Sequence, residues 1–464
     1  MDPRVSVAIL AAGLGTRMKS KTAKVLHKAG GLTLVEHVVR TAQAVASSAD
    51  IVVVTGHQAA SVEQTLTPYG VRFALQAEQK GTGHALRCAE AELPKEGYLV
   101  VLYGDAPLIS IDTVKRLIAA GKTSGAAGVV LTTRVADPTG YGRIVRDEAG
   151  NVAAIVEQKA ATPEQLKIDE INSGIYCFRA DLVWKYIGEI TTNNPAGEYY
   201  LTDIVEILRA KGYPTKPLEL PVADELLGIN TRVELAEVDR IFRAAKVRQV
   251  MLDGATIERP DTVSIDVDVV LGRDTIVQSH VRLLGKTVVG EDCIVGAGSV
   301  LENVVVGDGV CMEPYTLLAD STIGAGVRVG PFARLRMHNE VGANCHIGNF
   351  VELKNTKMAE GAKANHLAYL GDADIGSKVN VGAGTITCNY DGVNKHRTQV
   401  GAGAFLGSNS TLVAPVQIGA GSYVAAGSVV TDTVPADALA IGRGRQSNKD
   451  GWAAARRLTL KKTK

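Results

Sequence analysis

The chain has 464 residues, and its 50 lysine and arginine residues almost balance its 49 aspartate and glutamate residues, which leaves a formal net charge of +1. This length is enough for two or three domains with well-buried cores. A nearly neutral chain has no general attraction to nucleic acid or to a membrane surface, so any binding of anions must be local. We therefore expect neither nucleic acid nor a membrane among its partners.

Six cysteines, at positions 88, 177, 293, 311, 345 and 388, show no paired spacing. No apolar run reaches transmembrane length, and no charged, signal-type segment begins the chain. These features predict a cytoplasmic protein with reduced thiols. The basic tail, residues 456–464, is expected to be a solvated chain end, although it could also bind an anion.

The first predicted strand, Val5–Leu10, ends in a glycine-rich loop that is followed by cations. Gly13 and Gly15 lack the Cβ atoms that would keep backbone N–H groups away from phosphate oxygens. Arg17 and Lys24 can add charge-assisted hydrogen bonds to the same oxygens. A Gly-x-Gly turn after a strand is also common as an ordinary turn, so the loop alone leaves both interpretations open.

Aliphatic strands then alternate with amphipathic helices up to about residue 227. Strands are predicted at 5–10, 51–55 and 98–103, and helices near 33–46 and 84–91. This alternation predicts a mostly parallel sheet with helices on both faces. Ligands bind beyond the carboxyl ends of the strands in such sheets. Both the glycine loop and Asp105, just after the strand 98–103, lie at that edge.

Residues 231–252 carry an apolar stripe at helical spacing among charged residues. They predict one helix of about 33 Å, at ~1.5 Å per residue. Two placements stay open for it. It could be a stiff linker between two domains, or the last helix packed on the sheet domain.

From about residue 263, an aliphatic residue followed by glycine recurs in a six-residue frame. The pairs begin at residues 271, 289, 295, 306, 323, 329, 341, 347, 375, 381, 400, 406 and 418. Such hexapeptide repeats predict a parallel β-helix, in which the aliphatic residue points inward and the small residue lets the chain turn a corner. About ten coils at ~4.8 Å would make a prism roughly 50 Å long. The frame lapses at 347–375 and 381–400, where functional residues are expected.

With both halves considered, the chain resembles the bacterial bifunctional enzymes that combine N-acetylglucosamine-1-phosphate uridylyltransferase with glucosamine-1-phosphate acetyltransferase. The resemblance covers nearly the full length and is carried by the motifs LAAGLGTRM (10–18), KVLH (24–27), LQAEQKGTGHA (75–85), YGDAPL (103–108), DPTGYGRI (137–144), IVEQKAA (155–161), INSGIY (171–176), GIN (228–230), NHLAYLGDADIG (365–376) and GAGTITCNYDG (382–392).

The resemblance implies an α/β fold of three parts. They are a Rossmann-like nucleotidyltransferase domain (1–230), a linker helix (231–252) and a left-handed parallel β-helix with a C-terminal tail (253–464). It also implies a homotrimer, with each acetyltransferase site built from neighbouring subunits, and a place in the UDP-N-acetylglucosamine supply for peptidoglycan and lipopolysaccharide. Left-handed coils are an exception to the right-handed rule for parallel crossovers, and they are expected from the resemblance alone.

For uridylyl transfer, the resemblance implies UTP and N-acetylglucosamine 1-phosphate as substrates and Mg²⁺ as cofactor. The residues implied are Leu10, Ala11, Ala12, Gly13, Gln76, Gly81 and Thr82 for the nucleotide; Arg17 and Lys24 for phosphates; Tyr103, Gly104, Gly142, Glu157 and Asn172 around the sugar; and Asp105 and Asn230 for the metal. Carboxylate and amide oxygens suit Mg²⁺. The nucleophile is the substrate's own phosphate, so no protein base is required.

For acetyl transfer, the resemblance implies acetyl-CoA and glucosamine 1-phosphate as substrates. Its general base would be His366, since the sugar ammonium must lose a proton before it attacks. The other residues implied are Arg336, Lys354, Tyr369 and Asn380 for the sugar phosphate, and Ala383, Asn389, Tyr390, Ser408, Ala426 and Arg443 for acetyl-CoA.

The chain departs from the family pattern at three places. Ala23 replaces a proline before Lys24, which predicts a less stiff loop. Met337 and His338 follow Arg336 where the family has Pro-Gly, and Gly444 replaces a proline after Arg443, so that Arg445 could share the coenzyme contact.

Two rival functions have the same two-domain plan. A single-activity sugar-1-phosphate nucleotidyltransferase with a structural or regulatory β-helix would not need the His366, Tyr369 and Asn389 set. A non-enzymatic exchange-factor subunit could dispense with Arg17, Lys24 and Asp105. The sequence retains both sets.

Overall fold

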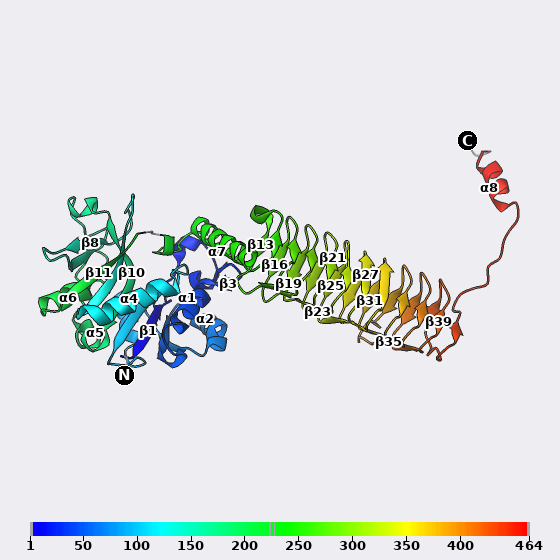
Figure 1. Cartoon of the computed structure of the whole chain (residues 1–464), viewed down its shortest axis with the longest axis horizontal. Helices are drawn as coiled ribbons and strands as arrows, with labels where there is room; N and C mark the ends of the chain where they lie inside the picture. The colour runs from blue at the N-terminus through cyan, green and yellow to red at the C-terminus, as the bar shows by residue number, and fades with distance from the viewer. Residues whose placement is uncertain (1–2, 222–223, 227, 462–464) are drawn as a thin grey trace. The chain divides into compact units, whose positions relative to one another are not determined.

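The computed structural model describes residues 3–221, 224–226 and 228–461, so the last three residues of the basic tail lie outside the described part. The chain forms two compact units that divide between Phe242 and Arg243. Figure 1 shows the mixed α/β unit in blue to green and the repeated short strands of the second unit in green to red. The division lies inside the predicted linker helix.

The N-terminal unit contains a nine-stranded sheet in the order β5-β4-β1-β6-β10-β7-β11-β9-β8. Its strands are β1 (Val5–Leu10), β4 (Ile51–Thr55), β5 (Arg72–Leu75), β6 (Tyr98–Tyr103), β7 (Gly128–Arg134), β8 (Arg143–Arg146), β9 (Val152–Val156), β10 (Glu170–Arg179) and β11 (Thr215–Leu220). Its helices are α1 (Leu34–Gln43), α2 (Ala59–Leu66), α3 (Thr82–Cys88), α4 (Ile111–Ser124), α5 (Ala180–Tyr186) and α6 (Asp203–Ala210).

The sheet is parallel in its first half and mixed in its second half, where β11 pairs with β7 in parallel. Strands β5, β4, β1 and β6 are parallel, as expected, but β10 runs antiparallel to β6 and β7, and β8 pairs with β9 as an antiparallel hairpin. The expectation of a mostly parallel sheet was wrong for this second half. The tight turn at Asp147–Asn151 closes the hairpin, and a hairpin needs no crossover helix.

Both faces of the sheet are buried, which explains why its central strands are almost continuously apolar. Along β1, Ala8 and Leu10 belong to one hydrophobic cluster, whereas Val7 and Ile9 belong to another. The period of two in a strand sends alternate side chains to opposite faces. The alternating apolar side chains of this strand therefore require a layer of packed side chains on each face of the sheet.

The pairing of β1 with β6 determines where the functional loops meet. Leu10 is in register with Tyr103, so the two strands end side by side. Their following residues are also connected, because the backbone N–H of Gly104 donates to the carbonyl of Leu10 at 3.0 Å. The glycine loop and Asp105 thus share one edge of the sheet, as the sequence predicted.

Helix α7 (Arg232–Leu252) matches the predicted helix closely. In the N-terminal unit, Val238 is buried in a small cluster and Phe242 stacks on His37 with a ring separation of 4.0 Å. In the C-terminal unit, Val247 and Val250 join the core of the β-helix. Its two ends therefore pack on different units, which combines both placements that the sequence left open.

The C-terminal unit is a parallel β-helix made of three sheets of 11, 10 and 9 strands. The first sheet runs from β12 (Thr256–Ile257) to β41 (Leu439–Ala440), the second from β13 (Ser264–Ile265) to β40 (Val429–Val430), and the third from β14 (Val270–Leu271) to β38 (Val416–Ile418). We call them sheets C, D and E. The predicted β-helix is confirmed.

Stacked aliphatic side chains form the interior of this unit. In sheet D, Leu318 of β22 (Leu317–Ala319) lies in register between Leu301 and Leu335, and all three are buried. Corners between strands often have a positive φ, which glycine, asparagine and aspartate tolerate best. Repetition of one inward pattern and one corner pattern therefore produces the prism.

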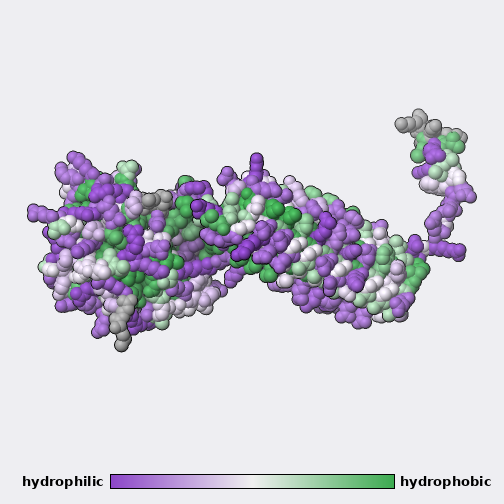
Figure 2. All heavy atoms as spheres, in the orientation of Figure 1, coloured by the Kyte–Doolittle hydropathy of each residue, from purple (hydrophilic) through white to green (hydrophobic). Residues whose placement is uncertain are grey.

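Hydrophilic residues cover most of the visible face of both units, with hydrophobic residues in smaller patches (Figure 2). Among the described residues, no helix combines the length and the apolar character needed to cross a bilayer. All six cysteines are free thiols.

We expect Leu318→Ala to lower the free energy of unfolding of the β-helix by about 2–5 kcal/mol, because it leaves a cavity between Leu301 and Leu335. Leu317, the preceding residue, is 44% exposed and is the matched control. Leu317→Ala should change the unfolding free energy by less than about 0.5 kcal/mol. Urea denaturation followed by circular dichroism measures both. Equal losses would contradict the inward stacking.

Candidate active sites

A cavity of 360 Å³ opens at the carboxyl edge of the parallel half-sheet in the N-terminal unit. Ten of the residues predicted for uridylyl transfer line it, namely Leu10, Ala11, Ala12, Gly13, Lys24, Gln76, Gly81, Thr82, Tyr103 and Asp105. These residues come from segments almost one hundred positions apart. The structure therefore brings together most of the set that the sequence predicted.

Two predicted phosphate cations and two predicted metal ligands contact one another at this cavity. The Lys24 ammonium forms an ion pair with Asp105 and donates to the amide oxygen of Asn230 at 3.2 Å. Arg17 donates to the same oxygen at 2.7 Å. The oxygens of Asp105 and Asn230 thus converge on one positive group.

This convergence fits a divalent cation. Carboxylate and amide oxygens are hard donors of the kind Mg²⁺ prefers. Within the described part of the chain, no cluster of three or more His, Cys, Asp or Glu residues could hold a metal. Asp105 and Asn230 alone would leave most of the coordination shell to phosphate oxygens and water, as is usual for Mg²⁺ at nucleotide sites.

Two glycines at the cavity are required by close packing. Gly15 has φ +62°, and a Cβ atom there would lie 2.6 Å from the Lys24 Cβ. Gly81 has φ +109°, and its Cβ would lie 2.5 Å from the carbonyl oxygen of Tyr199. Gly81 also accepts a hydrogen bond from the buried Gln76 side chain at 3.0 Å. These contacts hold the loops that carry Gly15 and Gly81 against their neighbours.

The residues predicted around the sugar adjoin the cavity through Tyr103. The backbone N–H of Asn172 donates to the Gly142 carbonyl at 2.9 Å, and a Cβ on Gly142 would lie 3.4 Å from a Glu157 carboxylate oxygen. Burial, with the negative charge of Asp203, raises the pKa of Glu157, and burial also raises the pKa of Tyr103. These groups form a polar wall beside the cavity.

Ala23 departs from the family's proline, yet its loop is tied down. Its backbone N–H donates to the side-chain oxygen of Gln58 at 2.9 Å, and the Gln58 amide donates to the Lys21 carbonyl at 2.5 Å. The expectation of a less stiff loop overlooked these two bonds. Gln58 lies 35 residues away in the sequence, so no local pattern marks it as a partner.

In the C-terminal unit, three predicted sugar-phosphate residues lie on sheet D. Arg336 ends β25 (Arg334–Arg336) and is in register with Lys354, which ends β28 (Glu352–Lys354). Tyr369 begins β31 (Tyr369–Gly371), and its hydroxyl would lie 2.5 Å from a Cβ on Gly371, the register partner of Lys354. The tyrosine ring therefore extends over Gly371 toward the lysine end of the sheet.

The corner between sheets C and D holds the predicted base and, stacked on successive coils, three of the six predicted coenzyme residues. His366 ends β30 (Lys363–His366), and Ala383, Ser408 and Ala426 occupy the same corner of the next three coils. Backbone hydrogen bonds of 2.7–2.9 Å connect these coils: Gly384 N–H to Leu367, Asn409 N–H to Ala383 and Gly427 N–H to Ser408. Arg443 comes close to Gly427, beyond this column.

Asn349 is a partner of His366 that the sequence reasoning missed. It is in register with His366 one coil earlier, and its amide oxygen lies 2.9 Å from the His366 Nδ1. Nδ1–H donating to this oxygen leaves the Nε2 lone pair available. Both side chains line a cavity of 340 Å³. Register with His366 was the only signal that could have revealed Asn349.

Two further predictions have different outcomes in the structure. Asn380, at the start of β33 (Asn380–Val381), lies on sheet C and not on sheet D with Arg336 and Lys354. A single β-helix therefore does not present all four predicted sugar-phosphate residues on one face. Met337 and His338 both have a positive φ, of 63° and 61°. The family's glycine would be unstrained at 338, whereas a proline at 337 could not adopt this conformation.

A hollow of 1070 Å³ runs along sheet E and contains none of the predicted site residues. Volume alone is a poor guide here, because an open trough on a flat sheet can be large without converging polar groups. Asn389 and Tyr390 lie at the corner between sheets D and E, and Asn389 is buried.

Comparisons with known proteins agree with this layout. A MobA-like NTP transferase domain matches residues 7–164, a hexapeptide repeat of succinyl-transferase matches 286–313, and a bacterial transferase hexapeptide (six repeats) matches 397–432. Bifunctional protein GlmU from Solibacter usitatus is 55% identical over 99% of both chains. The proteins of the same name from Koribacter versatilis and Acinetobacter baylyi are 47% and 42% identical, over 99% and 98% of this chain and 99% of theirs.

The matches extend through both units, so neither unit is an addition peculiar to this chain. With this identity over nearly its full length, the chain belongs to the family of the bifunctional GlmU proteins.

Proposed function

We propose that the chain acetylates glucosamine 1-phosphate with acetyl-CoA and then transfers UMP from UTP to the product, which gives UDP-N-acetylglucosamine and pyrophosphate. The observation that carries this proposal is full-length membership in a bifunctional family, with a predicted residue set gathered in each unit. Supplying glucosamine 1-phosphate, acetyl-CoA, UTP and Mg²⁺ together should yield UDP-N-acetylglucosamine.

The structure gives reasons to disfavour the two rival functions. A nucleotidyltransferase with a purely structural β-helix has no use for a corner that carries His366, its Asn349 partner and stacked small residues. An exchange-factor subunit has no use for Lys24 and Asp105 paired at the mouth of a cavity.

In the uridylyltransferase site, Arg17 and Lys24 would bind the triphosphate and guide the leaving pyrophosphate. Lys24 would exchange its partner Asp105 for phosphate oxygens. Asp105 and Asn230 would hold Mg²⁺, which neutralises charge on the phosphates when bound. Gly142, Glu157 and Asn172 would orient the sugar so that its phosphate lies in line for attack.

In the acetyltransferase site, His366 would accept a proton at Nε2 from the sugar ammonium, while Asn349 holds Nδ1–H. Arg336, Lys354 and Tyr369 would bind the sugar phosphate on sheet D. The small side chains Ala383, Ser408 and Ala426 would let the pantetheine arm lie along the corner, with Arg443 at its far end.

We further propose a homotrimer in a cytoplasmic location. Asn380 on sheet C and Lys354 on sheet D lie on different faces of one prism, which supports a site completed by a neighbouring copy. The free thiols of all six cysteines support a reducing compartment.

Asp105→Asn should reduce uridylyl transfer at least about 100-fold, because a neutral amide cannot replace the carboxylate beside Lys24 and Mg²⁺. Thiol release from acetyl-CoA should stay at the parental rate. The matched control is Asp112→Asn, at an exposed aspartate in the first turn of α4 outside the cavity. Equal loss of both activities in Asp105→Asn would contradict two separate sites.

His366→Asn should lower the acetylation rate by roughly 10²- to 10⁴-fold, the usual contribution of a general base. His280→Asn changes an exposed histidine at an equivalent corner several coils away and should have no effect. Steady-state kinetics of both variants with glucosamine 1-phosphate provide the test. Activity of His366→Asn within a few-fold of the parent would make His366 a structural residue.

Light scattering should give three times the 48.8 kDa mass of the chain. Because the acetyltransferase site is proposed to span two copies, dilution that dissociates the trimer should abolish acetyl transfer. Uridylyl transfer, which uses residues of one chain, should persist at the same dilution. A monomer with full acetyltransferase activity would refute the shared site.

A further inference from the structure

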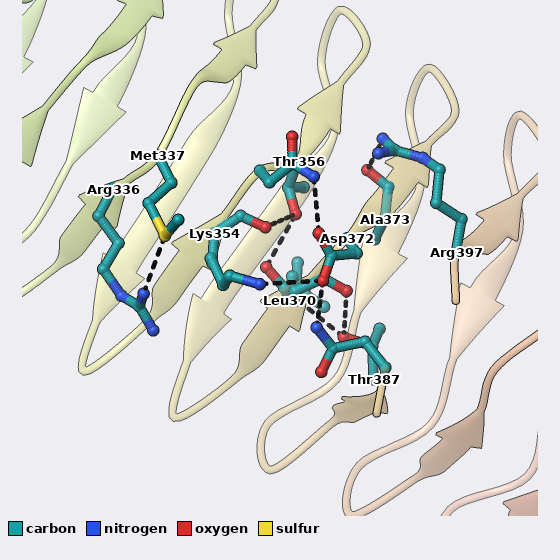
Figure 3. A network of polar contacts seen from close by, with 12 residues as sticks. Arg336, Met337, Lys354, Thr356, Leu370, Asp372, Ala373, Thr387 and Arg397 are labelled. Carbon is teal, nitrogen blue, oxygen red and sulfur yellow. Dashed lines mark hydrogen bonds and ion pairs between the residues drawn. The ribbon is translucent and has the colours of Figure 1, made fainter. Parts of the chain in front are cut away.

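One buried carboxylate in the β-helix contacts two residues assigned to different substrates. Asp372 follows β31, and its Oδ2 accepts hydrogen bonds from the Lys354 ammonium, at 3.0 Å, and from the side-chain amide of Asn389. Its Oδ1 accepts from Asn355 at 2.6 Å. Figure 3 shows the Lys354 side chain reaching across to Asp372. Lys354, Asp372 and Asn389 are only 6%, 6% and 8% exposed.

Backbone conformation does not explain why this residue is charged. Asp372 has φ +49°, and the same corner of earlier coils holds Asn303, Asp320 and Asn355 at 54°, 45° and 49°. Asparagine tolerates this conformation as well as aspartate does. Asp320, the other aspartate of this group, is exposed. The charge at position 372 must therefore serve the side chains around it.

The surrounding charges show what that negative charge does. Burial lowers the pKa of Lys354, but the hydrogen bond and charge of Asp372 outweigh it and raise that pKa overall. Burial likewise raises the pKa of Asp372, but the bonds from Asn355, Lys354 and Asn389 outweigh it and lower that pKa. Lys395 lies close enough to Lys354 that this neighbouring ammonium lowers the pKa of Lys395. Without Asp372, a buried ammonium would sit beside a second cation with no counter-charge.

We propose that Asp372 is a positioning residue for acetyl transfer, whose single carboxylate holds Lys354 and Asn389 at once and thereby couples the placement of the sugar phosphate to that of acetyl-CoA. This inference rests on the proposed function, because it takes Lys354 as a phosphate ligand and Asn389 as a coenzyme neighbour. Asp372 itself touches neither substrate. Its loss should therefore weaken the binding of both.

Asp372→Asn keeps the side-chain shape and the tolerance for positive φ but removes the charge. The KM for glucosamine 1-phosphate should rise about 10- to 100-fold, the scale of a hydrogen bond to a charged group. The KM for acetyl-CoA should rise about 3- to 10-fold through Asn389. Uridylyl transfer, measured on the same preparation, should stay within two-fold of the parent.

The matched control is Asp266→Asn. Asp266 pairs with Arg243 at 2.7 Å, and its side chain is 8% exposed, as is that of Asp372, but it lies at the other end of the β-helix. This variant loses an ion pair of an equally buried carboxylate and should keep both parental KM values. If it raised them as much as Asp372→Asn does, the effect would be one of general stability and the proposal would fall.

Double variants separate positioning from structure. In a Lys354→Met background, adding Asp372→Asn should leave the KM for glucosamine 1-phosphate unchanged, because the carboxylate acts there through the lysine. The KM for acetyl-CoA should still rise in that background, and it should stop rising in an Asn389→Ala background. Additive effects in both backgrounds would overturn the proposal.

A failure of Asp372→Asn to fold, and a failure of the proposed function, can each be distinguished from a failure of this inference. Should Asp372→Asn fail to fold because its lysine is left unpaired, the Lys354→Met double variant has no buried charge and carries the acetyl-CoA measurement alone. A parent without acetyl transfer would overturn the proposed function together with this inference. An active parent, an impaired Lys354→Met variant and parental KM values in Asp372→Asn would overturn the inference alone.

Discussion

Parallel strands paired in register decide which side chains meet in both units of this protein. In the N-terminal unit, β1 and β6 end together, so the glycine loop after Leu10 lies beside Asp105 although the two are almost a hundred residues apart. In the C-terminal unit, the same kind of pairing places His366 next to Asn349 of the preceding coil. It also repeats the same corner geometry from coil to coil. The chemistry in each unit therefore depends on a backbone hydrogen-bond pattern that carries no chemistry itself.

In both units, a lysine forms an ion pair with an aspartate at the place where an anionic substrate is expected to bind. Lys24 pairs with Asp105 in one unit and Lys354 pairs with Asp372 in the other. A partly buried ammonium with no partner is costly, so the protein supplies one. The two carboxylates differ in what else they do. The Lys24 ammonium that pairs with Asp105 also donates to Asn230. Asp372, in contrast, itself accepts hydrogen bonds from two asparagine side chains.

The sequence was most informative where apolar residues form a continuous run or recur at a fixed spacing. The buried strands β1, β4 and β6 and the hexapeptide coils follow from apolar patterning alone. The antiparallel pairing of β8 with β9 was missed because this hairpin depends on a local turn and not on the strand–helix alternation that guided the expectation. Asn349 and Asp372 were missed for other reasons. Asp372 occupies a positive-φ corner that accepts asparagine and aspartate for backbone conformation, and this hides the further role of its side chain. Asn349 ends strand β27 (His346–Asn349), and its link to His366 is a register pairing between coils.

The hydrogen bond between Ala23 and Gln58 has a consequence for how relatives of this loop can differ. A loop can be stiffened by a proline ring or by a bond to its backbone N–H, but the two devices exclude each other, because proline has no N–H to donate. Positions 23 and 58 are therefore coupled choices. A chimera that imports a proline at 23 while retaining Gln58 would leave the glutamine oxygen without this donor, so the two segments can be exchanged only as a pair.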